Sequence, residues 1–185
     1  MRTFIAVPLP PECQRMLGEI QSGLLTTNAD VRWVAISSIH LTLKFLGEID
    51  PARIPQLADA LHATSSAQAG FSLRIHGLGV FPNVHNPRVV WCGIDGEVPR
   101  LQHLQADVER ACAGMGFEPE NRDFHPHLTL GRVQGKRNLQ HLLDYIRIGS
   151  ELECTFHVDR YDIFKSTLTP RGAIYDVLKA IPLRI

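Results

Sequence analysis

The sequence has no excess of charge of either sign. Its 185 residues contain 19 lysines and arginines and 19 aspartates and glutamates, so the formal net charge is zero. Long-range attraction to a nucleic-acid backbone requires a positive field around the protein, and such a field is missing here. Any contact with nucleic acid is therefore expected to be short and local.

Long hydrophobic runs and closely spaced cysteines are missing as well. The apolar stretch from Phe4 to Leu9 is interrupted by Pro8, which makes it too short for a secretion signal, and no run approaches the length of a membrane span. No C-x-x-C pair is present, which argues against a zinc ribbon or a redox motif. The cysteines are expected to be buried thiols in a reducing compartment: Cys13, Cys92, Cys112 and Cys154. We therefore expect a cytoplasmic protein with no membrane partner.

The composition, with 44% hydrophobic and 21% charged residues, is that of one globular domain spanning residues 1–185. Apolar residues recur with a period of two in some segments and at helical spacing in others. Strands are expected over 3–9, 32–34, 40–46, 71–81, 89–94, 127–133, 156–165 and 174–178. Helices are expected over 11–24, 51–61, 101–115 and 139–146.

A tetrapeptide occurs twice. His-Leu-Thr-Leu stands at His40–Leu43 and again, 87 residues later, at His127–Leu130. The same offset places residues 3–7 on residues 90–94, and 71–81 resembles 156–166 at an offset of 85. This repetition predicts an α+β fold of two similar lobes, each an antiparallel sheet formed by one half of the chain, with helices packed on the outside. A pseudo-twofold would set the active cleft between the lobes.

On a strand, His40 and Thr42 share one face while the leucines pack behind them, and the same holds for His127 and Thr129. With nine histidines and nine threonines, chance gives roughly half an H-x-T match, so one copy would mean little. Packing explains the retention of the leucines in both copies. It does not explain the retention of a histidine and a threonine, which indicates a functional pair.

Two facing histidines suit phosphodiester chemistry, because imidazole titrates near pH 6.5 and can be neutral in one residue and protonated in the other. One ring can take a proton from water while the other gives one to the departing alkoxide, and threonine hydroxyls can hold the phosphate oxygens. The segment His125-Pro126-His127 has no acidic or cysteine ligand at a familiar metal spacing, so no metal or other cofactor is expected. His125 is expected to orient or cap the strand.

Several segments together resemble the 2H phosphoesterase superfamily, and within it the RNA 2',3'-cyclic phosphodiesterases, first named 2'-5' RNA ligases. The likeness covers nearly the whole chain. It is carried by the two H-x-T-x motifs and by Arg2–Ala6, Arg32–Val34, His40–Gly47 and Pro126–Arg132.

The resemblance implies hydrolysis of a 2',3'-cyclic phosphate, on an RNA 3' end or a nucleotide, to a 2'-phosphate with the P–O3' bond broken. It implies that His40 is the general acid and His127 the general base. It further implies that Thr42, Thr129 and Arg132 bind the substrate phosphate. We expect a monomer.

Arg132 raises a question of strand geometry. It lies five residues after His127, and an odd spacing places it on the opposite face unless the strand bulges, which Gly131 would permit. A plain surface arginine is the alternative. The aligned residue in the first half is Phe45, so the two halves differ chemically at this position.

The sequence offers several candidates for contacts with the rest of a nucleotide. The candidate platforms for a base are Phe4, Trp33, Phe45 and Phe81. The basic residues that could meet flanking phosphates are Lys44, Arg32 and Arg122.

Two other functions could use the residues of the two motifs: reversible 2'-5' RNA ligation, and nucleotide binding without turnover. Intact histidines in both motifs argue against the second.

Overall fold

The computed structural model describes residues 1–65, 67–170 and 172–184. Its strands form two antiparallel sheets, one ordered β3-β1-β8-β9 and the other β2-β6-β5-β4-β7. The first sheet contains β1 (Arg2–Val7), β3 (Leu41–Glu48), β8 (Arg160–Thr169) and β9 (Gly172–Pro182). The second contains β2 (Val31–Trp33), β4 (Phe71–Phe81), β5 (Val89–Gly96), β6 (His127–Val133) and β7 (Cys154–Val158). The predicted α+β, two-lobed fold is confirmed.

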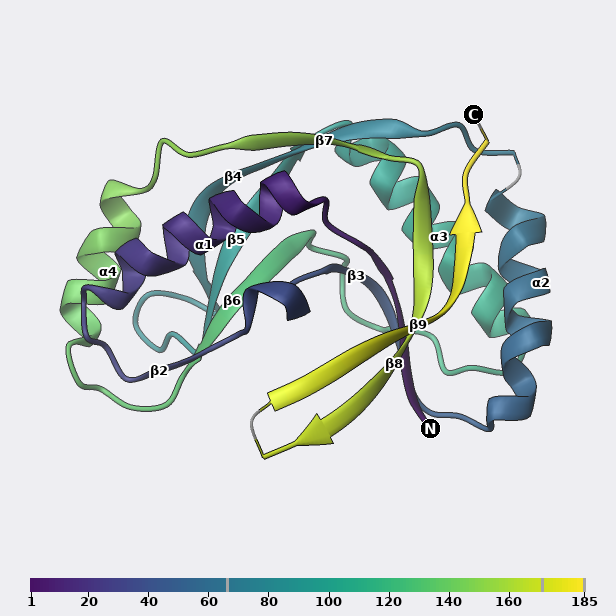
Figure 1. Ribbon diagram of the computed structural model, residues 1–185, viewed down its shortest axis with the longest axis horizontal. Helices are drawn as coiled ribbons and strands as arrows, with labels where there is room; N and C mark the ends of the chain where they lie inside the picture. Colours follow the sequence, from purple (N-terminus) through teal and green to yellow (C-terminus); the bar gives the residue numbers. More distant parts are fainter. Residues whose placement is uncertain (66, 171, 185) are drawn as a thin grey trace.

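Helices lie on the outer sides of the two sheets (Figure 1). They are α1 (Pro11–Leu25), α2 (Ile54–Ser65), α3 (Val98–Gly114) and α4 (Leu139–Ile148), with short 3-10 turns η1 (Ile36–Ser38) and η2 (Pro51–Arg53). Helices α2 and α3 cover the first sheet, whereas α1 and α4 cover the second. Helix α1 begins with Pro11 at its first position and buries the apolar residues predicted from their spacing. These are Cys13, Met16, Leu17, Ile20 and Leu24.

The two lobes do not coincide with the two halves of the chain, so the prediction that each half forms its own sheet is wrong. Strand β4, from the first half, joins the second sheet, and β8, from the second half, joins the first. Helix α1 follows β1 but packs on the second sheet, while α3 follows β5 but packs on the first. The halves exchange equivalent elements. Neither can bury its apolar faces without the other.

The pairing of strands also corrects the predicted offset between β1 and β5. Ala6 lies opposite Thr42, and Trp91 lies opposite Thr129. Equivalent positions on β1 and β5 are therefore 85 residues apart, although the motif strands are 87 apart. The two offsets differ by two residues, so the apolar faces of the equivalent strands still match.

Cys13 at the start of α1 and Cys154 at the start of β7 form a disulfide, with Cα atoms 5.6 Å apart. The prediction of buried thiols is correct for Cys92 and Cys112 and wrong for this pair. The two residues are 141 positions apart, and only the packing of α1 on β7 brings them together. Cytoplasmic location, which rested partly on free thiols, stays a prediction. No helix among the described residues is long and apolar enough to cross a membrane.

Candidate active site

The two motif strands, β3 of the first sheet and β6 of the second, contact each other. The Nδ1 atom of His40 lies 2.9 Å from the carbonyl oxygen of Ser38, and that of His127 lies 2.7 Å from the carbonyl oxygen of His125. A carbonyl can only accept, so each Nδ1 carries the proton and donates it. Each Nε2 is then free to accept a proton when the ring is neutral and to donate one when it is charged. Sequence reasoning did not single out Ser38.

A bulge interrupts each motif strand at the same place in the repeat. The register shifts opposite Leu43 in β3 and opposite Leu130 in β6. One extra residue restores the alternation, so Phe45 returns to the face of Thr42 and Arg132 to the face of Thr129. The bulge that Arg132 needed is therefore present. We call these two faces, which carry the histidines and threonines, the cleft faces.

Aromatic rings surround His40. Phe4 stacks on its imidazole with ring centroids 4.5 Å apart, and Tyr175 meets it edge-on at 5.1 Å. Phe164 stacks on Phe4 at 5.1 Å and also lies 6.1 Å from the His40 ring. Burial lowers the pKa of His40 to about 4, although the hydrogen bond to the Ser38 carbonyl acts in the opposite direction. Phe4 is only 2% exposed, so it supports the histidine and is not a platform for a base.

His127 has a different environment. Phe81 meets its ring edge-on at 5.0 Å and also contacts Trp91, with ring centroids 5.1 Å apart. The indole Nε1 of Trp91 is buried and has no hydrogen-bond partner among the described residues. Phe81 is thus engaged with the histidine and with Trp91. The two histidines share the same backbone orientation but are not equivalent in burial.

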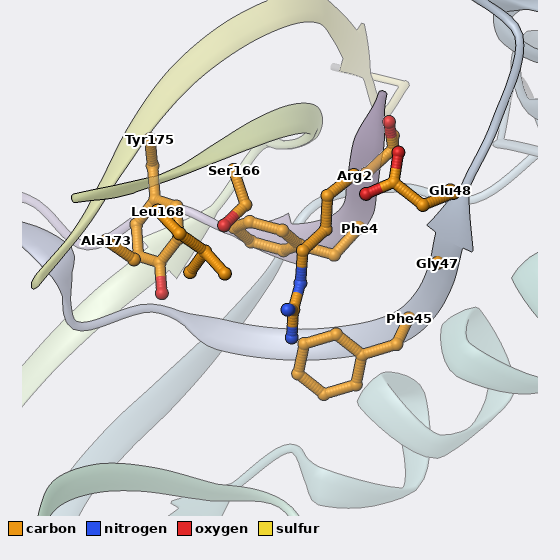
Figure 2. A pocket seen from close by; sticks show the side chains of 10 residues that line it. Arg2, Phe4, Phe45, Gly47, Glu48, Ser166, Leu168, Ala173 and Tyr175 are labelled. Carbon is orange, nitrogen blue, oxygen red and sulfur yellow. The ribbon is translucent and has the colours of Figure 1, made fainter.

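A cavity of about 270 Å³ lies next to His40 on the first sheet. Figure 2 shows the Arg2 side chain extending between the rings of Phe4 and Phe45. Tyr175 and Leu168 line the cavity on the side away from Phe45. Phe45 is 64% exposed, which makes it the accessible aromatic surface of this cavity. The predicted platform Trp33 lies elsewhere, since it packs against the backbone of Gly131 on the core side of β6.

Arg132 approaches the first lobe from the second. Burial raises the pKa of the Tyr175 phenol, while the positive charges of Arg2 and Arg132 both act to lower it. Tyr175 belongs to β9 and Arg132 to β6, so the charge of a side chain from the second sheet acts on a side chain of the first. Arg132 is exposed, and no carboxylate pairs with it in the described part of the chain.

A sequence profile of the 2'-5' RNA ligase superfamily matches residues 9–168. The chain belongs to this family. It is 34% identical to the RNA 2',3'-cyclic phosphodiesterase of Methanothermobacter thermautotrophicus over 99% of both chains. It is 36% identical to that of Thermotoga maritima, over 96% of this chain and 93% of the relative.

Solved structures agree with this assignment. TT0787 of Thermus thermophilus superposes with a TM-score of 0.85 at 27% identity, covering 100% of this chain and 98% of the other. E. coli LigT complexed with 3'-AMP superposes with a TM-score of 0.82 at 26% identity, covering 98% and 97%. The exchanged two-lobed architecture is therefore shared with phosphoesterases of this superfamily.

The structure separates two basic residues that the sequence of this 2'-5' RNA ligase superfamily member suggested for flanking phosphates. The prediction that Lys44 meets a flanking phosphate is wrong, because its Nζ is buried 2.7 Å from Glu109 Oε2 and 2.9 Å from the Glu118 carbonyl. The bulge at Leu43 turns Lys44 toward α3. Arg122 is exposed and pairs with Glu120 at 2.7 Å, so that carboxylate already occupies its guanidinium.

Proposed function

We propose that the protein hydrolyses 2',3'-cyclic phosphates on RNA 3' ends or nucleotides to 2'-phosphates. The observation that carries this proposal is the matched orientation of two histidines, each held at Nδ1 by the carbonyl two residues earlier. Acid–base catalysis of an in-line displacement needs two such nitrogens. The names of the curated relatives support the same substrate class.

In the proposed reaction His127 Nε2 takes a proton from water, whose oxygen attacks phosphorus. The P–O3' bond breaks, and O3' takes a proton from His40 Nε2, which leaves a 2'-phosphate and a free 3' hydroxyl. Solvent then restores the two protonation states. Thr42 and Thr129 donate hydrogen bonds to the non-bridging oxygens, and Arg132 supplies positive charge to the phosphate.

The acid role of His40 depends on the substrate. In the ligand-free protein the pKa of His40 is about 4, so the ring is neutral at neutral pH. A phosphodiester anion beside Nε2 favours the imidazolium and so raises this pKa. We therefore propose that His40 takes up its proton together with the substrate.

The cavity beside His40 is the proposed site for the nucleobase. Phe45 offers an exposed ring for stacking, and Arg2 and Tyr175 offer donors at the same cavity. A single terminal nucleotide bound in this way agrees with the zero net charge, because no extended nucleic-acid track is required.

The experiment that tests the function is a product assay on a short RNA ending in a 2',3'-cyclic phosphate, in the presence of EDTA. Conversion to the 2'-phosphate alone is expected. Production of the 3'-phosphate, or no conversion, would contradict the proposal. A cyclic mononucleotide assayed in parallel shows whether the enzyme recognises more of the RNA than its terminal nucleotide.

The assignment of acid and base needs a second substrate, in which sulfur replaces the bridging O3'. A thiolate departs without a proton, so it bypasses the general acid. His40→Ala should recover activity on the sulfur substrate relative to the oxygen substrate, whereas His127→Ala should not. Recovery by His127→Ala instead would reverse the two roles.

A further inference from the structure

Two arginines stand directly opposite each other on the second sheet. Arg32 of β2 pairs in register with Arg132 of β6. Residues directly opposite in an antiparallel pair point to the same face, with Cβ atoms about 5 Å apart. Arg132 is on the cleft face with Thr129, so Arg32 is on that face too.

This pair of like charges is not neutralised within the described part of the protein. Both arginines are exposed, and neither forms an ion pair with a carboxylate there. The nearest acidic neighbour in sequence, Asp30, lies against Gly135 instead. Like charges directly opposite on a sheet are destabilising, so the arrangement is unfavourable unless an anion binds between the guanidinium groups.

The arginine pair lies further from the histidines than the threonines do. Along β6, Arg132 is two register positions beyond Thr129, which corresponds to about 7 Å of strand. Arg32 lies one strand further out, at the edge of the sheet. Two guanidinium groups also offer more donors than one phosphate held by two threonines requires. The position and the number of donors both indicate a second anionic group.

We propose that Arg32 binds the phosphate on the 5' side of the ribose that carries the cyclic phosphate, with Arg132 contributing positive charge to both phosphates. This inference rests on the proposed function. In such a nucleotide the base leaves the ribose from C1', beside C2', whereas the 5' carbon leaves from C4', beside C3'. The base and the 5' phosphate thus leave from opposite ends of the ribose, so a base in the Phe45 cavity places the 5' phosphate away from that cavity, and the arginines stand outside it on the second sheet.

Recognition of a 5' phosphate by Arg32 would define the substrate class more narrowly. Arg32 is a specificity residue that distinguishes a nucleotide within a chain, or one with a 5' phosphate, from a nucleoside 2',3'-cyclic phosphate with a free 5' hydroxyl. A charge-assisted bidentate contact of this kind changes affinity by about tenfold or more. Because the contact is electrostatic and exposed, added salt should weaken the preference.

The test compares kcat/KM for adenosine 2',3'-cyclic phosphate with and without a 5' phosphate. We expect the wild type to prefer the 5'-phosphorylated form by about tenfold or more. Arg32→Ala should abolish most of this preference by lowering kcat/KM for the phosphorylated substrate. Arg32→Lys should keep part of the preference, because lysine keeps the positive charge but lacks the planar guanidinium that binds a phosphate bidentately. Arg15→Ala, at an exposed position on α1, is the matched control and should keep the full preference.

The outcomes separate the two proposals. Turnover of both substrates with equal kcat/KM in the wild type would overturn the role of Arg32 and leave the proposed function intact. An equal loss on both substrates in Arg32→Ala would also overturn it. Failure to turn over either substrate, and failure on a short RNA ending in a 2',3'-cyclic phosphate, would overturn the proposed function itself. If Arg32→Ala does not fold by circular dichroism, the wild-type preference and Arg32→Lys still decide the question.

Discussion

The ring of Phe4 stacks on the ring of His40, with centroids 4.5 Å apart and planes inclined by 28°. Phe4 is itself buried against Phe164, so the imidazole rests on a fixed apolar support. This contact orients the ring and also removes it from water. The pKa of about 4 for His40 follows from that loss of hydration.

The stability of the protein should therefore fall as the pH is lowered through the range between the two pKa values of His40. The unfolded chain protonates this residue near pH 6.5 and the folded protein only near pH 4, so the unfolded state binds more protons in between. On the order of 3 kcal/mol of stability is present above about pH 6.5 and lost below about pH 4. Urea unfolding across this range should show the loss in the wild type. The variant His40→Gln cannot titrate at this position and should lack this part of the pH dependence. If the free energies of unfolding of the two proteins fell in parallel with pH, the account would be contradicted.

Reduction of the Cys13–Cys154 disulfide should destabilise the fold. The bridge joins residues 141 positions apart, and a disulfide typically stabilises a protein by about 2–4 kcal/mol, with longer loops at the upper end. Urea unfolding with and without dithiothreitol measures the difference. The double variant Cys13→Ser, Cys154→Ser should be as stable as the reduced protein and insensitive to the reductant. An unchanged midpoint in the reduced wild type would show that the bridge contributes nothing.

Local patterns predicted the elements of this fold well, because the signals for them are local. The strand at His127–Val133 was predicted with its observed bounds, and the apolar stripe of α1 was predicted residue by residue. The exchange of β4 and β8 between the lobes was not predicted, since hydrogen-bond partners distant in sequence leave no periodic signal. The position of Lys44 was missed for a related reason, because one bulged residue inverts every side chain beyond it.

Within the candidate site, the duplicated motif selected both histidines and both threonines as candidates from sequence, and their roles stay a prediction. The aromatic residues around His40 come from three different strands. Of these, only Phe4 was a candidate from sequence, and it was expected to be a platform for a base. Tyr175 and Phe164 carry no local motif. The disulfide also depends on tertiary packing that spacing alone cannot indicate.

Gly131 should not tolerate a side chain. A Cβ atom there would lie 2.6 Å from Val31 Cγ1 and 2.8 Å from Trp33 Cε3, so these two side chains of β2 would have to shift. Gly131→Ala should lower the free energy of unfolding by about 1–3 kcal/mol, as other overpacked sites do. Gly114→Ala, at the end of α3 with open space around it, is the matched control and should be neutral or slightly stabilising. Equal stability of the two variants would refute the close packing of β2 on β6.

The threonines should act through their hydroxyl groups. Thr42→Ala and Thr129→Ala should each lower kcat by about a hundredfold, the usual effect of losing one donor to a transition-state oxygen. Thr42→Ser and Thr129→Ser keep the hydroxyl and should retain most of the activity. Steady-state kinetics on a cyclic-phosphate oligonucleotide measures all four variants. If the serine variants lose as much as the alanine variants, the methyl group and its packing matter, not the hydrogen bond.

The most direct test of the paired-histidine account is a double-mutant cycle on His40 and His127, with kcat/KM measured on a 2',3'-cyclic phosphate oligonucleotide. His40→Ala and His127→Ala should each lower kcat/KM by about a thousandfold or more, and the double variant should lose little beyond either single one. That result is expected if the two rings act together in one displacement. Near-normal turnover in either single variant, or losses that multiply in the double variant, would contradict it.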